Sequence, residues 1–171
     1  PSLGTTPRTA PSQVMIDAMR VCFEHHMNYD RTGYPITSAE WGQATLSRIV
    51  AMADCFDAIT AHRAYHKRPH TAFEGLRVLL GPNRVNFDPV VLWALIKTVG
   101  LYPAGTVMQT SSGHTVLSMS PNPADVARPT CRVLLGPSGA APAEGEPSLW
   151  EPMPASETVA RVLPPEEHRA D

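Results

Sequence analysis

The segment EHHMNYDRTGYP, residues 24–35, places two adjacent histidines shortly before a Gly-Tyr-Pro turn. A helix is predicted before it, because QVMIDAMRVCFE has apolar side chains at helical spacing and Ser12 is a good N-cap. On that helix His25 and His26 continue the apolar stripe, so we expect both rings on the core-facing side. Read alone, the pair fits either a metal site or two histidines at a helix end that meet the helix dipole.

A second helix is predicted at about residues 43–61, QATLSRIVAMADCFDAITA, where apolar side chains again recur at helical spacing. Asp57 falls inside the apolar arc and Asp54 at its edge, and a carboxylate in such a place needs a partner. We expect Asp57 to be structural and to hold backbone groups or an arginine such as Arg48. Asp54 is the carboxylate that a second helix would offer to the two histidines.

The two histidines and Asp54 are ligand types for borderline divalent metals such as zinc, iron, manganese or nickel. Successive residues on a helix point about 100° apart, so His25 and His26 suit two neighbouring ions better than one. Two ions about 3.5–4 Å apart are the usual arrangement for phosphoester hydrolysis. We expect Asp30 to shape its loop rather than to bind metal, because aspartate favours turns.

The rest of the chain divides by composition. Two shorter helices are predicted, TAFEGLRVLLG and NFDPVVLWALIKTVG, the second with Asp88 as N-cap and Gly100 as its stop. Met15, Met19 and Trp93 are expected in the core. The predicted organisation is a linker at 1–11, a helical domain at 12–100, a small β appendage of three strands at 101–135 and a tail at 136–171. The tail is rich in Pro, Ala, Gly and Glu, so we expect disorder or loose packing there. The chain as a whole is expected to be mainly α.

Bulk properties exclude several classes of function. The 171 residues carry a formal net charge of −2, which gives no basic field for nucleic acid. No apolar run approaches the roughly 20 residues of a membrane span, and no signal-peptide pattern is present. The three cysteines are far apart and lack a C-x-x-C spacing, which is typical of reduced thiols in a cytoplasmic protein.

Three segments together resemble the HD-GYP family of metal-dependent phosphohydrolases. They are HHMNYDRTGYP, LSRIVAMADCFDAITAHRAY and NFDP, which agree in order and spacing with that family's pattern across roughly residues 12–100. The stretch from VGLYPAG to RVLL also resembles the small β appendage that follows the domain in some members. The resemblance implies an HD-type helical fold, two or three iron or manganese ions, and hydrolysis of the bacterial second messenger cyclic di-GMP.

The resemblance also implies roles for particular residues. His25, His26 and Asp54 match metal ligands of the family. Tyr34 belongs to the turn near the substrate, and Arg63 matches an arginine near the substrate phosphates, where its planar fork would pair with phosphate oxygens. Lys67, or its neighbour His66, stands where the family often has another basic residue. No catalytic acid or base is assigned within these residues.

The chain departs from the family in ways that leave alternatives open. Met27 stands where a glutamate is usual, and Arg31 where a glycine is usual. No His-Asp dipeptide occurs in the 171 residues, although the family's dyad supplies a bridging ligand. We therefore expect a C-terminal part of a longer enzyme, with further domains upstream and no activity alone. The alternatives are a degenerate regulatory module that binds a nucleotide or a protein without turnover, and a phosphohydrolase for another nucleotide.

Overall fold

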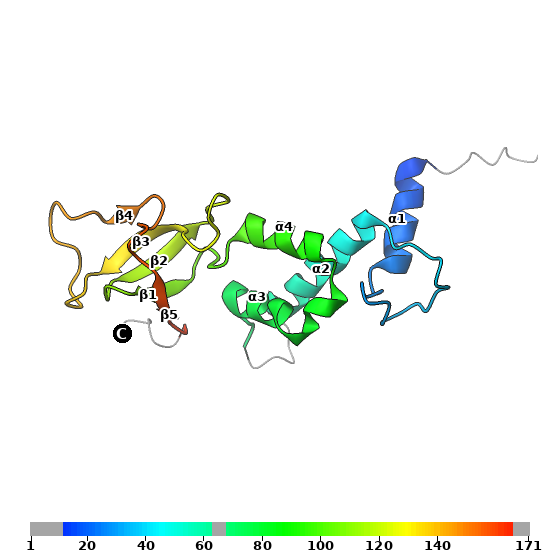
Figure 1. Ribbon diagram of the computed structural model, residues 1–171, viewed down its shortest axis with the longest axis horizontal. Coiled ribbons are helices and arrows are strands. Elements are labelled where there is room, and N and C mark those ends of the chain that lie inside the picture. The colour runs from blue at the N-terminus through cyan, green and yellow to red at the C-terminus, as the bar shows by residue number, and fades with distance from the viewer. Residues whose placement is uncertain (1–11, 63–67, 166–171) are drawn as a thin grey trace, which may run out of the picture.

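The computed structural model describes residues 12–62 and 68–165, and Figure 1 shows helices in the first half of the chain and strands in the second. The helices are α1 (Gln13–Glu24), α2 (Thr45–Thr60), α3 (Ala72–Leu80) and α4 (Pro89–Val99), with the 3-10 helix η1 (Pro82–Asn86) before α4. The strands are β1 (Val107–Thr110), β2 (Thr115–Ser120), β3 (Thr130–Leu135), β4 (Leu149–Trp150) and β5 (Val159–Val162).

The predicted start of α1 and both predicted ends of α4 are confirmed, and each is marked by a capping residue. The Ser12 hydroxyl accepts a hydrogen bond from the Met15 amide at 3.3 Å and so begins α1. Asp88 accepts from the Val90 amide at 2.8 Å, and the proline that follows Asp88 is the first residue of α4. Gly100 ends α4 with a φ of 81°, a conformation that favours glycine.

The prediction of a mainly α protein with a disordered tail is wrong. Five strands form an antiparallel sheet in the order β4-β3-β2-β1-β5, and the two edge strands come from the segment that was predicted to be a tail. Strand β5 pairs with β1, with Met108 opposite Val162, although the two residues are far apart in the sequence. The tail is ordered because it supplies Trp150 and Met153, which are almost fully buried against the sheet.

Two separate cores hold the described part of the chain together. In the helical half, buried residues come from α2, α3 and α4; they are Met52, Leu79, Leu92 and Ile96. In the second half, residues from four segments bury one face of the sheet; they are Met108, Val116, Cys131, Val133, Trp150 and Met153. Helix α1 belongs to neither core and lies at the end of the molecule opposite the sheet (Figure 1).

The apolar stripe of α1 is exposed, which corrects the expectation that it faces a core. Val14 is 78% exposed and Met19 is 62% exposed. Met15 and Trp93, also predicted to be core residues, are exposed as well. Helix α1 packs on α2, and its Phe23 ring lies 5.6 Å from the Trp41 ring, but most of its apolar side chains remain exposed.

Within the described ranges, 12–62 and 68–165, the helices are too short or too polar for any of them to cross a bilayer.

Candidate functional site

The two histidines stand at the end of α1, where the backbone leaves the helix. His25 is the C-cap, and its amide donates to the Val21 carbonyl at 3.0 Å. The Nδ1 atom of His25 lies 3.0 Å from the Val21 carbonyl oxygen and 3.1 Å from that of Cys22. Because carbonyl oxygens only accept hydrogen bonds, Nδ1 carries the proton, and neutral His25 keeps its lone pair on Nε2. Metal-binding histidines are commonly fixed in this way by a backbone carbonyl.

The rings of His25, His26 and Tyr34 form a continuous aromatic group. The centroids of the two imidazoles are 4.0 Å apart, and the Tyr34 ring lies 4.8 Å from that of His26. His26 and Tyr34 are exposed, whereas His25 is half-buried. The expectation that both histidines face the interior is therefore wrong for His26. The site that these rings offer is an open surface.

The loop after the histidines folds back so that Tyr34 meets His26. Met27 bridges to Gly33, and the Tyr34 amide donates to the His26 carbonyl at 3.2 Å. Gly33 has a φ of 87°, and a Cβ on it would lie 2.5 Å from the His26 carbonyl oxygen. Glycine is therefore required by both conformation and space, which explains the first residue of the Gly-Tyr-Pro turn.

Asp30 and Arg31 shape the tip of this loop. The Asp30 carboxylate accepts from the Thr32 hydroxyl at 2.6 Å and from the Thr32 amide at 3.0 Å, and these hydrogen bonds lower the pKa of Asp30. Arg31 has a φ of 69°, a backbone conformation that glycine adopts more readily than a residue with a side chain. Its guanidinium donates to the Ala39 carbonyl at 2.6 Å. The predicted role of Asp30 in shaping the loop agrees with these contacts.

Glu24 is a residue whose importance the sequence did not reveal. Its side chain is fully buried, yet it directly precedes His25. One carboxylate oxygen accepts from Arg20 Nε at 2.8 Å and from Trp41 Nε1 at 2.9 Å, and the other accepts from the Ala44 amide at 2.8 Å. Burial would raise the pKa of Glu24, but hydrogen bonds from these groups outweigh burial and lower it.

The Glu24 contacts connect α1 to the start of α2. Ala44 is the N-cap residue of α2, and it has no capping side chain of its own. The side-chain Nε2 of Gln43 donates to the backbone carbonyls of Glu24 and Met27, at 3.1 and 3.0 Å. Glu24 therefore fixes both ends of the loop that carries Tyr34. No motif in the sequence marks this role, because the two donors beyond α1, Trp41 and Ala44, lie 17 and 20 residues downstream.

An ion pair fixes the outer side of the same loop. Arg48 donates to Asp88 at 2.8 Å, and its guanidinium lies 5.3 Å from the centroid of the Tyr29 ring. Tyr29 in turn donates its amide to the Asn86 carbonyl at 2.8 Å. Asp57 was expected to hold backbone groups or an arginine such as Arg48, and the arginine is wrong, because Arg48 pairs with Asp88, the N-cap of α4, and Asp57 is exposed.

The structure describes one of the remaining predicted site residues, Asp54. Asp54 is on an exposed part of α2, next to Cys55, whose thiol pKa is raised by burial and by the Asp54 charge. Arg63 and Lys67 lie outside the described residues. In the described part of the chain, no three His, Cys, Asp or Glu side chains gather closely enough to hold a metal ion. His25, His26 and Asp54 therefore do not form a complete metal site by themselves.

Two curated proteins with cyclic di-GMP phosphodiesterase in their names are similar to this chain. One, from Pseudomonas aeruginosa, is 39% identical over 102 residues, which are 60% of this chain and 24% of the relative. The other, from Vibrio cholerae serotype O1 and named as a probable cyclic di-GMP phosphodiesterase, is 30% identical over 79 residues, which are 46% of this chain and 18% of the relative. The matched segments thus span a quarter or less of each relative.

Family models and solved structures add no further relative. No family model matches the chain, and no solved structure matches it. The similarity to proteins named as cyclic di-GMP phosphodiesterases is therefore the finding on which a function can be argued.

The chemistry of the described residues fits a metal in part. His25 presents Nε2 with its proton fixed on the other nitrogen, and His26 presents an exposed imidazole beside it. Two imidazoles are suitable ligands for a borderline divalent ion, but a stable site needs four or more donors. The described residues thus supply one side of a metal centre.

Proposed function

We propose that this chain is part of a metal-dependent phosphodiesterase of the HD-GYP type that hydrolyses cyclic di-GMP. The observation that carries the proposal is the histidine pair at the end of α1, with the Tyr34 ring against His26 and the loop between them fixed by Gly33. The similarity to two proteins named as cyclic di-GMP phosphodiesterases supports the same function and the same substrate.

Each predicted residue has a proposed role in the intact protein. His25 and His26 would bind two or three iron or manganese ions together with Asp54 and ligands outside these 171 residues. Such ions would supply positive charge for the phosphodiester and lower the pKa of bound water. The Tyr34 ring, which is 63% exposed, offers a flat face beside the imidazoles that suits stacking against a base. Arg63 and Lys67 would contact the phosphates.

The chain's own residues would mainly orient the imidazoles. The two carbonyls at His25 Nδ1 hold that ring in one tautomer, and the Glu24 contacts hold the loop that brings Tyr34 to His26. Because ligands from elsewhere are needed, we expect the 171 residues alone to show no phosphodiesterase turnover. Robust turnover by this chain alone would contradict that expectation.

Hydrolysis of cyclic di-GMP by the longest natural protein that contains this chain tests the proposal. We expect measurable iron or manganese in the purified protein and conversion of cyclic di-GMP to linear or mononucleotide products, measured by chromatography. His25→Ala and His26→Ala should each lower activity at least roughly 100-fold, since even the removal of a group that supports a ligand costs 10–100-fold. His114→Ala is the control, because His114 lies in the turn between β1 and β2, where its ring contacts Trp150.

Two outcomes would point to the alternatives. Binding of cyclic di-GMP without turnover or bound metal would favour a regulatory module that has lost the enzymatic function. Turnover of another cyclic or linear nucleotide in place of cyclic di-GMP would favour a phosphohydrolase with a different substrate.

A further inference from the structure

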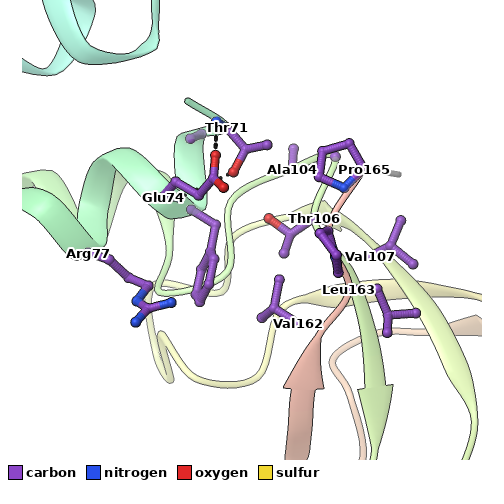
Figure 2. A pocket seen from close by; sticks show the side chains of 13 residues that line it. Thr71, Glu74, Arg77, Ala104, Thr106, Val107, Val162, Leu163 and Pro165 are labelled. Carbon is purple, nitrogen blue, oxygen red and sulfur yellow. Dashed lines mark hydrogen bonds between the residues drawn. The ribbon is translucent and has the colours of Figure 1, made fainter. Parts of the chain in front are cut away.

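A pocket of about 330 Å³ lies between α3 and the strands β1 and β5. Figure 2 shows Glu74, turned toward Thr71, and Arg77 on the helix side of this region, and Val107, Val162 and Leu163 on the strand side. The volume is in the range typical of small-molecule sites. The pocket shares no lining residue with the histidine pair or with Asp54.

Most of the pocket wall is apolar. The helix contributes the Phe73 ring, and the sheet half contributes Val107 and Val162 with the residues that follow β5. The strand side is fixed by the sheet, because the Leu163 amide donates to the Val107 carbonyl at 2.9 Å. Phe73 is fixed as well, because its ring stacks on Tyr102 with centroids 5.9 Å apart and an interplanar angle of 17°. The pocket is therefore preformed and offers an aromatic face to a ligand.

The acidic group in the wall is already neutralised. Both oxygens of Glu74 accept from Arg68, at 2.8 and 2.9 Å. One of them also accepts from the Thr71 amide at 2.8 Å (Figure 2). The Thr71 hydroxyl accepts from the Glu74 amide in return, which completes a capping box. The Thr106 hydroxyl donates to the Pro103 carbonyl at 2.6 Å. These groups need nothing from a ligand.

Arg77 is the exception among the polar groups of the wall. It lies one turn after Glu74 on α3, and its side chain is exposed at the pocket. Among the residues that the structure describes, no acid or carbonyl accepts a hydrogen bond from its guanidinium. A guanidinium beside apolar walls is complementary to a ligand that carries an anion on an apolar body.

We propose that this pocket binds a small aromatic carboxylate, with its ring against Phe73 and the two valines and its carboxylate on Arg77. The planar fork of arginine matches a carboxylate in a bidentate arrangement. A single negative charge matches the pocket better than a double one, because Glu74 is already paired with Arg68 and Arg77 supplies one unbalanced positive charge among the described lining residues. Since the walls come from both halves of the chain, a bound ligand would also hold the two halves together.

Calorimetric titration of the 171-residue protein with 2-naphthoate tests the proposal. We expect 2-naphthoate to bind, with shifts in the backbone amide signals of Gly105 and Val107, which line the pocket. The neutral analogue 2-naphthylmethanol should bind at least roughly tenfold more weakly, because a charge-assisted hydrogen bond contributes more than one factor of ten. The doubly charged 2-naphthyl phosphate should bind more weakly than 2-naphthoate.

Three variants place the binding at the pocket. Arg77→Gln should weaken 2-naphthoate binding about tenfold or more, whereas Arg84→Gln, an exposed arginine on η1 outside the pocket, should change it less than twofold. Ala104→Trp fills the pocket from the exposed position Ala104 and should abolish binding while the thermal unfolding midpoint stays unchanged.

Several results would overturn the proposal. They are equal binding of the acid and the alcohol, an equal loss in Arg77→Gln and Arg84→Gln, unchanged binding in Ala104→Trp, and an absence of shifts at Gly105 and Val107. Naphthyl phosphate that binds as tightly as the carboxylate would overturn the preference for a single charge.

Discussion

The helical half and the sheet half of this chain differ in how they cover their apolar residues. The sheet buries one face under residues from four segments, including Trp150 and Met153 from the end of the chain. The helical half buries a core among α2, α3 and α4 but leaves the apolar side of α1 open, with Val14 and Met19 largely in solvent. An apolar helix face of this kind normally marks a contact surface.

The two halves therefore differ in whether the described residues bury their own apolar surface. The sheet half has what a small fold needs, which is three or more strands and a buried apolar face. Helix α1 has a cap, a loop and a buried carboxylate that fix its end, but little burial of its own stripe. The residues proposed to bind metal lie on the incomplete half. The predictions below test whether the two halves differ in solution as they do in the structure.

The largest expected effect comes from a methionine in the sheet core. Met108 is fully buried on β1, whereas Met19 is 62% exposed on α1. Met108→Ala should lower the free energy of unfolding by about 2–5 kcal/mol, because it removes buried apolar surface and leaves a cavity. Met19→Ala is the matched control and should change it by less than about 0.5 kcal/mol. Denaturant unfolding measures both, and equal losses would show that α1 is covered in solution.

Glu24 gives the next largest effect, because it is the buried anchor of the incomplete half. Glu24→Gln removes the charge that accepts from Arg20, Trp41 and the Ala44 amide, and should cost about 1.5–3 kcal/mol of stability. Glu40→Gln, an exposed carboxylate in the same loop, should be neutral within about 0.5 kcal/mol. The NMR signals of the Tyr34 ring should shift in Glu24→Gln and stay unchanged in Glu40→Gln. A neutral Glu24→Gln would show that the loop is held by other contacts.

The sequence predicted those elements that short-range signals specify. Ser12, Asp88 and Gly100 determine helix ends through contacts within three or four residues, and these ends were predicted correctly. The edge strands were missed because β4 has only two residues and β5 pairs with a strand some fifty residues earlier. Such long-range pairing has no local pattern, and a proline-rich composition around it favours a prediction of disorder.

The candidate functional site was likewise predicted only where short-range signals specify it. The adjacent histidines and the Gly-Tyr-Pro turn can be read directly, since a sharp backbone turn requires Gly33. The burial of Glu24 could not be read, because its partners lie across a loop of irregular structure. The exposure of the α1 stripe was also missed, since apolar periodicity predicts a face and says nothing about which surface covers it.

A smaller effect depends on pH and concerns the junction of the two halves. Hydrogen bonds from Arg68 lower the pKa of Glu74 from 4.5 to about 2. A carboxylate with a lowered pKa stabilises the fold above its unfolded value, and this stabilisation is lost as the pH falls from about 4.5 to about 2. Arg68 is partly exposed, so we expect the loss to be about 1–2 kcal/mol, less than the full shift would give.

Thermal unfolding across that pH range, with Glu74→Gln as the comparison, measures the contribution of this carboxylate. The wild-type protein should lose more stability than the variant as the pH falls below 4.5. Glu144→Gln, an exposed carboxylate in the loop between β3 and β4, is the control and should keep the wild-type pH dependence. Equal pH dependence in wild type and Glu74→Gln would show that the ion pair with Arg68 does not persist in solution.

The smallest expected effect on stability comes from the open face of α1 itself. Val14→Lys and Met19→Lys add charge where the structure shows solvent, so each should change the free energy of unfolding by less than about 0.5 kcal/mol. The same variants should reduce the fluorescence of 1-anilinonaphthalene-8-sulfonate, which reports exposed apolar surface. Val90→Lys is a useful control, because Val90 is 75% exposed on α4, away from this face.

The two readouts together distinguish an open face from a covered one. If α1 is open, dye fluorescence falls in Val14→Lys and Met19→Lys while stability stays constant, and Val90→Lys changes fluorescence less. If stability falls by more than about 1 kcal/mol, the face is packed in solution, since a charge buried in an apolar contact is costly. The helical half would then be as complete as the sheet half, and the proposal that ligands from elsewhere complete the histidine pair would lose its structural support.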